Sequence, residues 1–212
     1  MVARDAIGFG LTQTPPKLQF DIDMWFRLVI GLLDALDIPA AHLIGNPFGG
    51  ARIATRHPER VDGLVLVGSV ATRFPLAQEL DTVWGYTPSF ENRRKLMRMF
   101  MYDANSIDHD AIQLRLDASR RRGRQEAFAQ LFPAPRQRWV DRLASPDAAL
   151  AALHHRVLIV HGRDDRVVPM RASLHVHEAK HFELHLFGAC GHWPHVEHTE
   201  RFHQVAAFLS AD

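Results

Sequence analysis

Residues 157–169 read Val-Leu-Ile-Val-His-Gly-Arg-Asp-Asp-Arg-Val-Val-Pro, an apolar run that passes directly into a polar loop with two adjacent aspartates. A short apolar run of this kind, bounded by glycine and proline, is typical of a strand that is buried on both faces. A second junction follows at 182–193, where Phe-Glu-Leu-His-Leu-Phe leads through Gly-Ala-Cys to Gly-His-Trp. The two junctions predict strands that end in an aspartate loop and in a histidine loop.

Two further apolar runs, 42–45 and 64–68, predict two more strands. A helix should precede the first of them, because Asp21 or Asp23 can cap it and Pro39 lies just past its end. The apolar residues of this helix recur at helical spacing: Trp25, Leu28, Val29, Leu32, Leu33 and Leu36. Another helix should end the chain. Strands separated by helices predict an α/β fold with a mostly parallel sheet that helices cover on both faces.

A long segment between the second and third predicted strands has a different pattern, with polar helices punctuated by prolines. We expect this segment, 74–153, to form a helical cap inserted into a core made of residues 1–73 and 154–212. The basic run 120–124 within it should be a solvated helix end and not a nucleic-acid contact, because the net charge of the chain is only +1.

The order of these elements is itself informative. The turn after the first strand, Gly45-Asn-Pro-Phe-Gly49, has G-x-x-x-G spacing, which alone is weak evidence. The order found in α/β-hydrolases is the same: a strand, this turn, a strand, a helical insertion, a strand ending at an aspartate and a strand ending at a histidine. In that fold the nucleophile lies on a strained turn, the acid follows a later strand, and the histidine comes last.

The chain also resembles one family within this fold, the meta-cleavage product hydrolases, and most closely its 2-hydroxymuconate-semialdehyde hydrolase branch. The resemblance covers nearly the whole chain and rests on these stretches: Asp5-Ala-Ile-Gly-Phe-Gly10, Gly45-Asn46, Phe48-Gly-Gly50, Val83-Trp-Gly-Tyr-Thr-Pro88, Arg115 in its helix, Pro135-Arg-Gln-Arg-Trp139, His161 to Pro169 and Cys190 to Trp193. It implies an α/β-hydrolase fold with a helical cap. It also implies hydrolysis of a carbon–carbon bond in 2-hydroxy-6-oxo-dienoates, products of meta ring fission in aromatic catabolism, by a Ser-Asp-His mechanism without a cofactor.

The resemblance implies a role for several residues near the predicted strand ends. Asp165 matches the acid that orients the imidazole, His192 matches the general base, and Trp193 matches the indole beside that base. Asn46 matches the amide next to the nucleophile. The backbone N–H of Phe48 matches one donor of the oxyanion hole.

One further match concerns the predicted cap. Arg115 matches a cap arginine that holds the substrate's carboxylate or enol oxygens. A planar anion of this kind suits the forked donor of a guanidinium group. A surface position in the cap is the other interpretation of Arg115.

Two departures from the family pattern argue against activity. The nucleophile's position holds Pro47, which has no hydroxyl group and whose ring restricts the backbone of the turn. The family's first strands and its His-Gly loop, which supplies the other oxyanion donor, have no counterpart before Met1, so we expect an incomplete core and half an oxyanion hole. A smaller departure follows the turn, where the segment is short and Arg52 replaces a small apolar residue. The sequence as written therefore predicts an inactive or severely impaired hydrolase.

The composition limits the class of protein. The chain has 212 residues, of which 47% are hydrophobic. These are enough apolar side chains for one sizeable core, but the chain has too few residues for two ordinary domains. The 25 Lys and Arg residues nearly balance the 24 Asp and Glu residues, which argues against a nucleic-acid partner. The absence of a long apolar run argues against a membrane partner, and the single cysteine excludes an internal disulfide, so we expect a cytoplasmic protein. The 14 histidines lack metal-ligand spacing, and we expect no metal site.

Three functions remain open at this stage. The first is a meta-cleavage product hydrolase that is weakly active or altered at the turn. The second is a non-catalytic, truncated homologue that binds a small carboxylate or a partner chain. The third is another α/β-hydrolase activity, such as an esterase, which the cap stretches 84–88 and 135–139 disfavour. Cys190 is a poor candidate nucleophile, because residues so close to His192 along a turn rarely meet it as nucleophile and base.

The first predicted strand, 42–45, raises a question of assembly. In the family's sheet its neighbour on one side is a strand that would precede this chain. We therefore expect an exposed edge with unpaired backbone groups, which favours self-association as a dimer or a larger oligomer. The other expected partner is a small molecule, a dienoate or another carboxylate.

Overall fold

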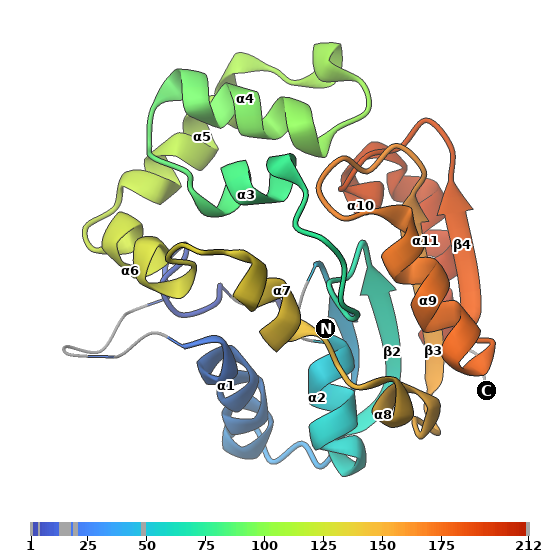
Figure 1. Cartoon of the computed structure of the whole chain (residues 1–212). Coiled ribbons are helices and arrows are strands. Elements are labelled where there is room, and N and C mark those ends of the chain that lie inside the picture. Colours follow the sequence, from blue (N-terminus) through green and yellow to red (C-terminus); the bar gives the residue numbers. More distant parts are fainter. Residues whose placement is uncertain (1, 4, 13–17, 19–20, 48–49, 211–212) are drawn as a thin grey trace.

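Four parallel strands form the centre of the computed structural model, which describes residues 2–3, 5–12, 18, 21–47 and 50–210 (Figure 1). Along the sheet the strands follow the order in which they occur in the chain. They are β1 (Ala41–Gly45), β2 (Val61–Val67), β3 (Arg156–Gly162) and β4 (Glu183–Phe187). Each pairs in parallel with the next. The α/β fold and the four strands predicted from the apolar runs are confirmed.

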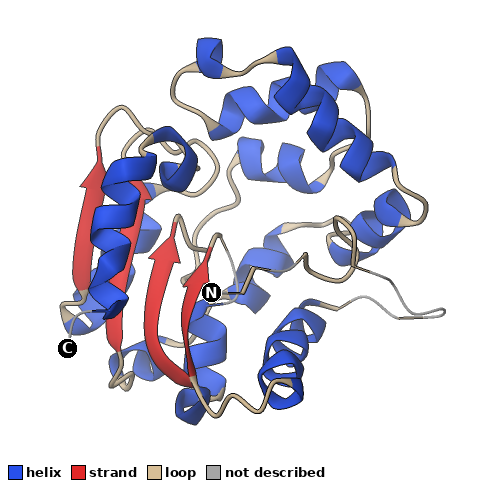
Figure 2. Cartoon of the chain, turned by 180° about the vertical axis from the view of Figure 1, so that it is seen from behind, coloured by secondary structure: helices blue, strands red, loops and turns tan. Residues whose placement is uncertain are grey.

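Helices cover both faces of this sheet, as Figures 1 and 2 show from opposite sides. On one face Leu64 and Leu66 of β2 pack into a cluster with residues of α1 (Ile22–Ala35), α2 (Gly50–Arg56) and α9 (Met170–Lys180). On the other face Val65 and Val67 pack with Phe202 of α11 (Thr199–Ala206), which follows the short α10 (Pro194–Glu197). The 3-10 turns are Pro58–Arg60, Ala104–Ser106 and Ala207–Ser210. Alternate residues of β2 therefore serve two apolar clusters.

The start of the chain agrees with the sequence analysis only in part. Asp21 caps α1 as predicted, because its carboxylate accepts a hydrogen bond of 2.6 Å from the backbone N–H of Met24. In the sequence, residues 1–10 read as the last residues of a strand that runs into a glycine-rich turn. This prediction is wrong for residues 2–3 and 5–6, which form no strand. A strand needs a partner for its backbone hydrogen bonds, and β1 pairs with β2 alone among the described strands.

The segment between β2 and β3 is helical, as predicted, and we call it the helical insertion. It comprises α3 (Gln78–Trp84), α4 (Phe90–Phe100), α5 (His109–Arg120), α6 (Arg124–Leu131), α7 (Gln137–Leu143) and α8 (Asp147–Ala151). Figure 1 shows α3, α4 and α5 beyond the carboxyl ends of the strands, whereas α8 returns towards α2. None of the helices described is long and apolar enough to cross a bilayer.

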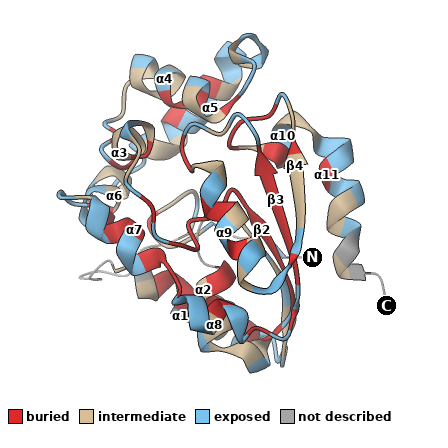
Figure 3. Ribbon diagram, turned by 45° about the vertical axis from the view of Figure 1, so that its right-hand side comes forward, coloured by how far each residue is buried: buried red, intermediate tan, exposed pale blue. Residues whose placement is uncertain are grey.

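The helical insertion and the sheet share one apolar cluster. Trp84 and Phe132 stack with ring centroids 4.6 Å apart and planes at 1°, and Phe132 also lies 6.2 Å from Trp25 of α1. All three side chains are buried together with residues of β2 and β3, the strands that are buried almost throughout in Figure 3. The division into a core of residues 1–73 and 154–212 and a cap of residues 74–153 stays a prediction.

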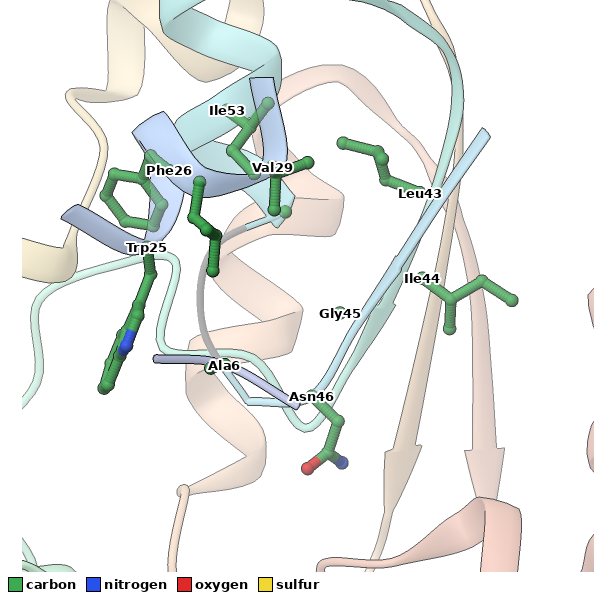
Figure 4. A pocket seen from close by; sticks show the side chains of 11 residues that line it. Ala6, Trp25, Phe26, Val29, Leu43, Ile44, Gly45, Asn46 and Ile53 are labelled. Atoms are coloured by element: carbon green, nitrogen blue, oxygen red, sulfur yellow. The ribbon is translucent and has the colours of Figure 1, made fainter. Parts of the chain in front are cut away.

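Strand β1 is one of the two edge strands of the described sheet, and β4 is the other. The residues of β1 alternate between the two faces, and Figure 4 shows Leu43 directed towards Val29 and Ile53 while Ile44 points away from them. Ile44 is 50% exposed. The expectation of an open edge along β1 therefore holds for the part of the chain that the structure describes.

The carboxyl ends of β3 and β4 approach each other very closely. A Cβ atom added at Gly162, the last residue of β3, would lie 2.0 Å from the carbonyl oxygen of Gly191 and 2.5 Å from that of Cys190. No side chain fits at that distance, so only glycine lets the loop after β4 pass here. This contact sets the position of the residues that follow Gly191.

We predict that Gly162→Ala lowers the free energy of unfolding by about 1–3 kcal/mol or more, because the added methyl group must displace backbone atoms. Gly31→Ala is the control, since a Cβ at Gly31 in α1 meets no atom within 4 Å. It should raise stability by about 0.5–1 kcal/mol, the ordinary gain of alanine over glycine in a helix. Urea unfolding monitored by circular dichroism measures both, and equal stabilities of Gly162→Ala and the unchanged protein would contradict the close packing.

Candidate active site

Loops at the carboxyl ends of three strands bring the predicted site residues together. Asn46 and Pro47 follow β1, Asp165 follows β3, and His192 and Trp193 follow β4. In parallel sheets the carboxyl edge is the usual place of binding sites, because the loops of separate strands converge there. The predicted residue Phe48 lies outside the described residues.

Asp165 and His192 form a buried hydrogen-bonded pair. The carboxylate Oδ2 of Asp165 lies 2.8 Å from Nδ1 of His192, and the exposed fractions of the two side chains are 0% and 3%. The other oxygen, Oδ1, accepts hydrogen bonds from the backbone N–H groups of Val167 and Val168, at 2.8 and 3.0 Å. Because the carboxylate can only accept, Nδ1 of His192 carries a proton and Nε2 is the nitrogen available as a base.

The pKa of Asp165 reflects two opposing influences. Burial raises the pKa of this carboxyl group, but the charge and hydrogen bond of His192, the charge of His161 and the backbone N–H of Val168 lower it by more. The net pKa is below the usual range, so the group stays ionised. An ionised Asp165 holds the imidazole of His192 in one orientation.

His161 is a neighbour of this pair for which the sequence indicated no role. Its Nδ1 lies 2.8 Å from the hydroxyl of Ser173, its Nε2 lies 3.1 Å from the carbonyl oxygen of Val168, and its side chain is fully buried. The carbonyl accepts from Nε2–H, so Nδ1 accepts from the hydroxyl. Burial lowers the pKa of His161 against the opposing charge of Asp165, 3.6 Å away. Its position inside a strand pattern gave no signal of this contact.

Gly68 leaves room for the pair at the end of β2. Its φ is +49°, and a Cβ there would lie 3.2 Å from both Oδ2 of Asp165 and Nδ1 of His192. Both the backbone conformation and the space favour glycine at this position.

The turn after β1 is attached to the same region by hydrogen bonds. The side-chain amide of Asn46 donates to the backbone carbonyl of His192 at 3.1 Å, and the carbonyl of Pro47 accepts from the backbone N–H of Val70 at 2.7 Å. Nε2 of His192 makes no hydrogen bond to any residue in the described ranges. The turn therefore lies beside the imidazole, as predicted, but Pro47 offers it no hydroxyl group.

Arg52, which follows the turn, has a structural environment. Its Nη1 donates to the carbonyl oxygen of Ala144 at 3.1 Å, and its Nε lies 3.6 Å from the carboxylate of Asp23. These contacts link α2 to the helical insertion and to α1. The arginine thus joins three elements where a small apolar residue was expected from the family pattern.

Cys190 does not provide a nucleophile in place of a serine. Its side chain is buried, and burial together with the negative charge of Glu197 raises the pKa of the thiol to about 12. The thiolate, which is the reactive form, is therefore scarce at neutral pH.

Trp193 and Arg115 lie next to the pair on the side of the helical insertion. The guanidinium of Arg115 is stacked over the indole of Trp193 at 4.4 Å, and the ring of Phe100 lies 4.7 Å from the same indole. The carbonyl of Phe100 accepts a hydrogen bond of 2.6 Å from the backbone N–H of His192. Arg115 is exposed, so it also fits the interpretation as a surface residue of the cap. Partial desolvation of its guanidinium and the positive charge of Arg93 lower the pKa of Arg115.

A cavity of about 310 Å³ lies beneath the helical insertion. Its walls contain Arg115, Trp193 and Phe100, so it begins beside His192, although neither His192 nor Asp165 lines it. Arg124 also lines it, and its Nη2 donates to the carbonyl of Thr12 at 2.7 Å. The expectation that the whole basic run is a solvated helix end is therefore wrong for Arg124, although residues 120–122 are exposed.

A second cavity, of about 280 Å³, lies along the open edge of the sheet (Figure 4). It is mainly apolar, with walls from α1 and β1, and it reaches Asn46. Among the described residues no group of three or more His, Cys, Asp or Glu side chains could hold a metal ion.

Comparison with known proteins agrees with this geometry. The pattern of the alpha/beta hydrolase family matches residues 5–205. The chain belongs to the alpha/beta hydrolase family. It is 47% identical to a 2-hydroxymuconate semialdehyde hydrolase of Pseudomonas sp. strain CF600, over 100% of this chain and 76% of the relative. It is 46% identical to a 2-hydroxy-6-oxo-2,4-heptadienoate hydrolase of Pseudomonas putida strain F1, over 100% of this chain and 79% of the relative.

This alpha/beta hydrolase is also similar to solved structures of meta-cleavage product hydrolases. A mutant of the meta-cleavage product hydrolase CumD of Pseudomonas fluorescens IP01, complexed with acetates, superposes with a TM-score of 0.93 at 44% identity. The match covers 97% of this chain and 77% of that chain. The resemblance to the meta-cleavage product hydrolases, carbon–carbon bond hydrolases of aromatic catabolism, is thereby confirmed. The individual roles of Asp165, His192, Asn46, Arg115 and Trp193 stay predictions.

We predict that Asp165→Asn lowers the free energy of unfolding at pH 7 by about 1–3 kcal/mol, because the amide replaces an ionised acceptor in a buried network. The pKa of Asp165 is lowered in the folded protein, so its contribution to stability is present above the unfolded pKa of about 3.9 and is lost as the pH falls through the folded pKa. The difference between the two proteins should therefore shrink as the pH falls below about 5.

Urea unfolding between pH 7 and pH 3 measures this difference. Asp164→Asn is the matched control, because Asp164 is the exposed neighbour in the same loop. It should have little effect at any pH. A loss of stability in Asp165→Asn that stays constant over this pH range would argue against a contribution from the ionised carboxylate.

Proposed function

We propose that this chain binds a 2-hydroxy-6-oxo-dienoate in the cavity beneath the helical insertion, and that its hydrolysis of the carbon–carbon bond is severely impaired. The observation that carries this proposal is the intact pair of Asp165 and His192 beside a turn in which Pro47 takes the place of the nucleophile. The names of the similar proteins, hydrolases of 2-hydroxymuconate semialdehyde and of a heptadienoate, support this substrate class.

Each site residue has a place in the reaction under this proposal. Asp165 orients the imidazole, and Nε2 of His192 accepts a proton from the attacking water and later returns it to the leaving carbon. Arg115 holds the carboxylate or enol oxygens of the substrate, and Trp193 supports its guanidinium. Asn46 fixes the turn against the histidine loop. The backbone N–H of Phe48 is proposed as an oxyanion donor.

Pro47 removes the atom that would form the covalent bond to the carbonyl carbon. Without that atom His192 can activate only water, whose attack lacks the fixed geometry of a side-chain nucleophile. The non-catalytic alternative, a homologue that binds a small carboxylate, is favoured by the same residue. Binding by Arg115 needs no nucleophile, so the two functions share the ligand and differ in turnover.

We predict that the chain hydrolyses a meta-cleavage dienoate at least about a thousandfold more slowly than an intact relative, as expected when a triad loses its nucleophile. The yellow colour of the dienolate should persist in a spectrophotometric assay. Pro47→Ser should raise the rate only in part, because an error near 1 Å in the turn can cost about a hundredfold. His192→Ala should remove that gain. Bleaching by the unchanged chain at about 1 per second or faster would overturn the proposal.

We further propose that the exposed edge of β1 mediates self-association. Ile44 lies on a strand that pairs only with β2 among the strands that the structure describes, and open strand edges pair readily with another chain. We predict that Ile44→Lys weakens association, because a lysine at an edge opposes strand pairing. Leu36→Lys is the matched control, since Leu36 is 48% exposed but lies at the end of α1. Sedimentation at several concentrations would contradict the proposal if both variants associated like the unchanged chain, or if that chain were a monomer.

A further inference from the structure

Three arginines from three successive helices line the cavity beneath the helical insertion. Arg93 belongs to α4, Arg115 to α5 and Arg124 to α6. None of the residues that line this cavity is an aspartate or a glutamate. Nor does the sequence of residues 13–17 and 19–20, which the structure does not describe, contain a carboxylate side chain. In the part of the chain that the structure describes, the cavity wall therefore combines positive charge with no acidic side chain.

Arg93 has an environment that favours an anionic ligand. Its guanidinium is stacked over the ring of Tyr86 at 4.2 Å, and its Nε is buried without a hydrogen-bond partner. Within the described ranges neither Arg93 nor Arg115 forms an ion pair. Arg124 differs, because it donates to the carbonyl of Thr12. Two fork-shaped donors thus remain without a carboxylate partner in one cavity.

The two guanidinium groups also affect each other. The positive charge of Arg93 contributes to the lowered pKa of Arg115, so the two like charges lie close enough to repel. Both arginine side chains are fixed on aromatic rings, Arg93 on Tyr86 and Arg115 on Trp193. A ligand with two negative groups would relieve this repulsion and satisfy both forks.

The remaining walls suit the hydrocarbon part of such a ligand. Apolar side chains of the helical insertion line the same cavity, among them Val83, Leu96, Phe100 and Phe128. Arg115, through Trp193, is the arginine next to His192. Arg93, stacked on Tyr86 instead, is the arginine of the same cavity that is left for a second acid group of the ligand.

We propose that Arg93 is a second carboxylate site and that the ligand class of this cavity is a dicarboxylate, a dienoate with an acid group at its far end as well. This inference rests on the proposed function for the first carboxylate at Arg115. It adds a specificity residue, because a monocarboxylate of equal length would leave Arg93 without a partner. A guanidinium left without a partner in a partly buried site disfavours binding of the ligand that has only one acid group.

Two probes of equal length isolate the second carboxylate. Both have a chain of six carbons with conjugated double bonds at positions 2 and 4: trans,trans-2,4-hexadienedioate has two acid groups and trans,trans-2,4-hexadienoate has one. Titration calorimetry of the full chain should give at least about tenfold tighter binding of the diacid, the usual scale for one charge-assisted pair. Because the measurement is of binding, it does not depend on turnover.

Three variants assign the effect to a residue. Arg93→Gln should weaken binding of the diacid at least about tenfold and leave that of the monoacid within about twofold. Arg115→Gln should weaken both probes. Arg98→Gln is the matched control, because Arg98 lies on the same helix but is exposed and does not line the cavity. It should change neither affinity. Arg93→Lys, which keeps the charge but loses the fork, should retain part of the preference, and unchanged melting temperatures would show that each variant folds.

The outcomes separate the two proposals. Equal affinities of the unchanged chain for the two probes, or an effect of Arg93→Gln on both or on neither, would overturn the second carboxylate site. In that case monoacid binding that depends on Arg115 would leave the proposed function standing. Another outcome is a preference for the diacid that depends on Arg93 while Arg115→Gln binds both probes like the unchanged chain. This result would keep the new site and would remove Arg115 from the proposed function. Binding of neither probe would overturn both.

Discussion

The hydrogen bond between Asp165 and His192 is the contact on which the arrangement of the strand ends depends. A buried carboxylate is costly unless it is fully paired, and here His192 and two backbone N–H groups provide the partners. Removing one partner of a buried charge typically costs about 3–5 kcal/mol. The close packing at Gly68 and Gly162 brings the loops to this distance. The pair therefore contributes to folding as well as to any chemistry, which explains how it can persist beside a turn without a nucleophile.

The turn that carries Pro47 is tied to the same place by bonds that need no hydroxyl group. Asn46 donates to the carbonyl of His192, and the carbonyl of Pro47 accepts from Val70. The nucleophile's atom and the position of the turn are thus separate properties of this structure. These bonds hold Asn46 and Pro47 beside the imidazole, whereas the proline ring still restricts the local backbone geometry on which an attack would depend.

The sequence was sufficient for the sheet and for the pair, because apolar runs and motif order are local signals. It was insufficient where the deciding contact is distant. The first residues read as a strand end, but a strand also needs a partner. His161 lies within a strand pattern, and only the structure shows that it contacts Ser173 and Val168. Arg124 belongs to a basic run, yet its bond to Thr12 takes it into the cavity wall. No sequence pattern links such residues before the chain folds.

Binding and catalysis depend on different parts of this molecule. The groups of the Asp165–His192 pair lie on loops of the sheet, whereas Arg93 and Arg115 lie on helices of the insertion. The apolar cluster formed around Trp84 and Phe132 joins the insertion to the sheet without involving the turn after β1. A change at Pro47 therefore leaves the supports of both arginines in place. Among the described residues neither guanidinium has an acidic partner, and both are held on aromatic rings in the wall of one cavity, so their placement favours binding of an anion.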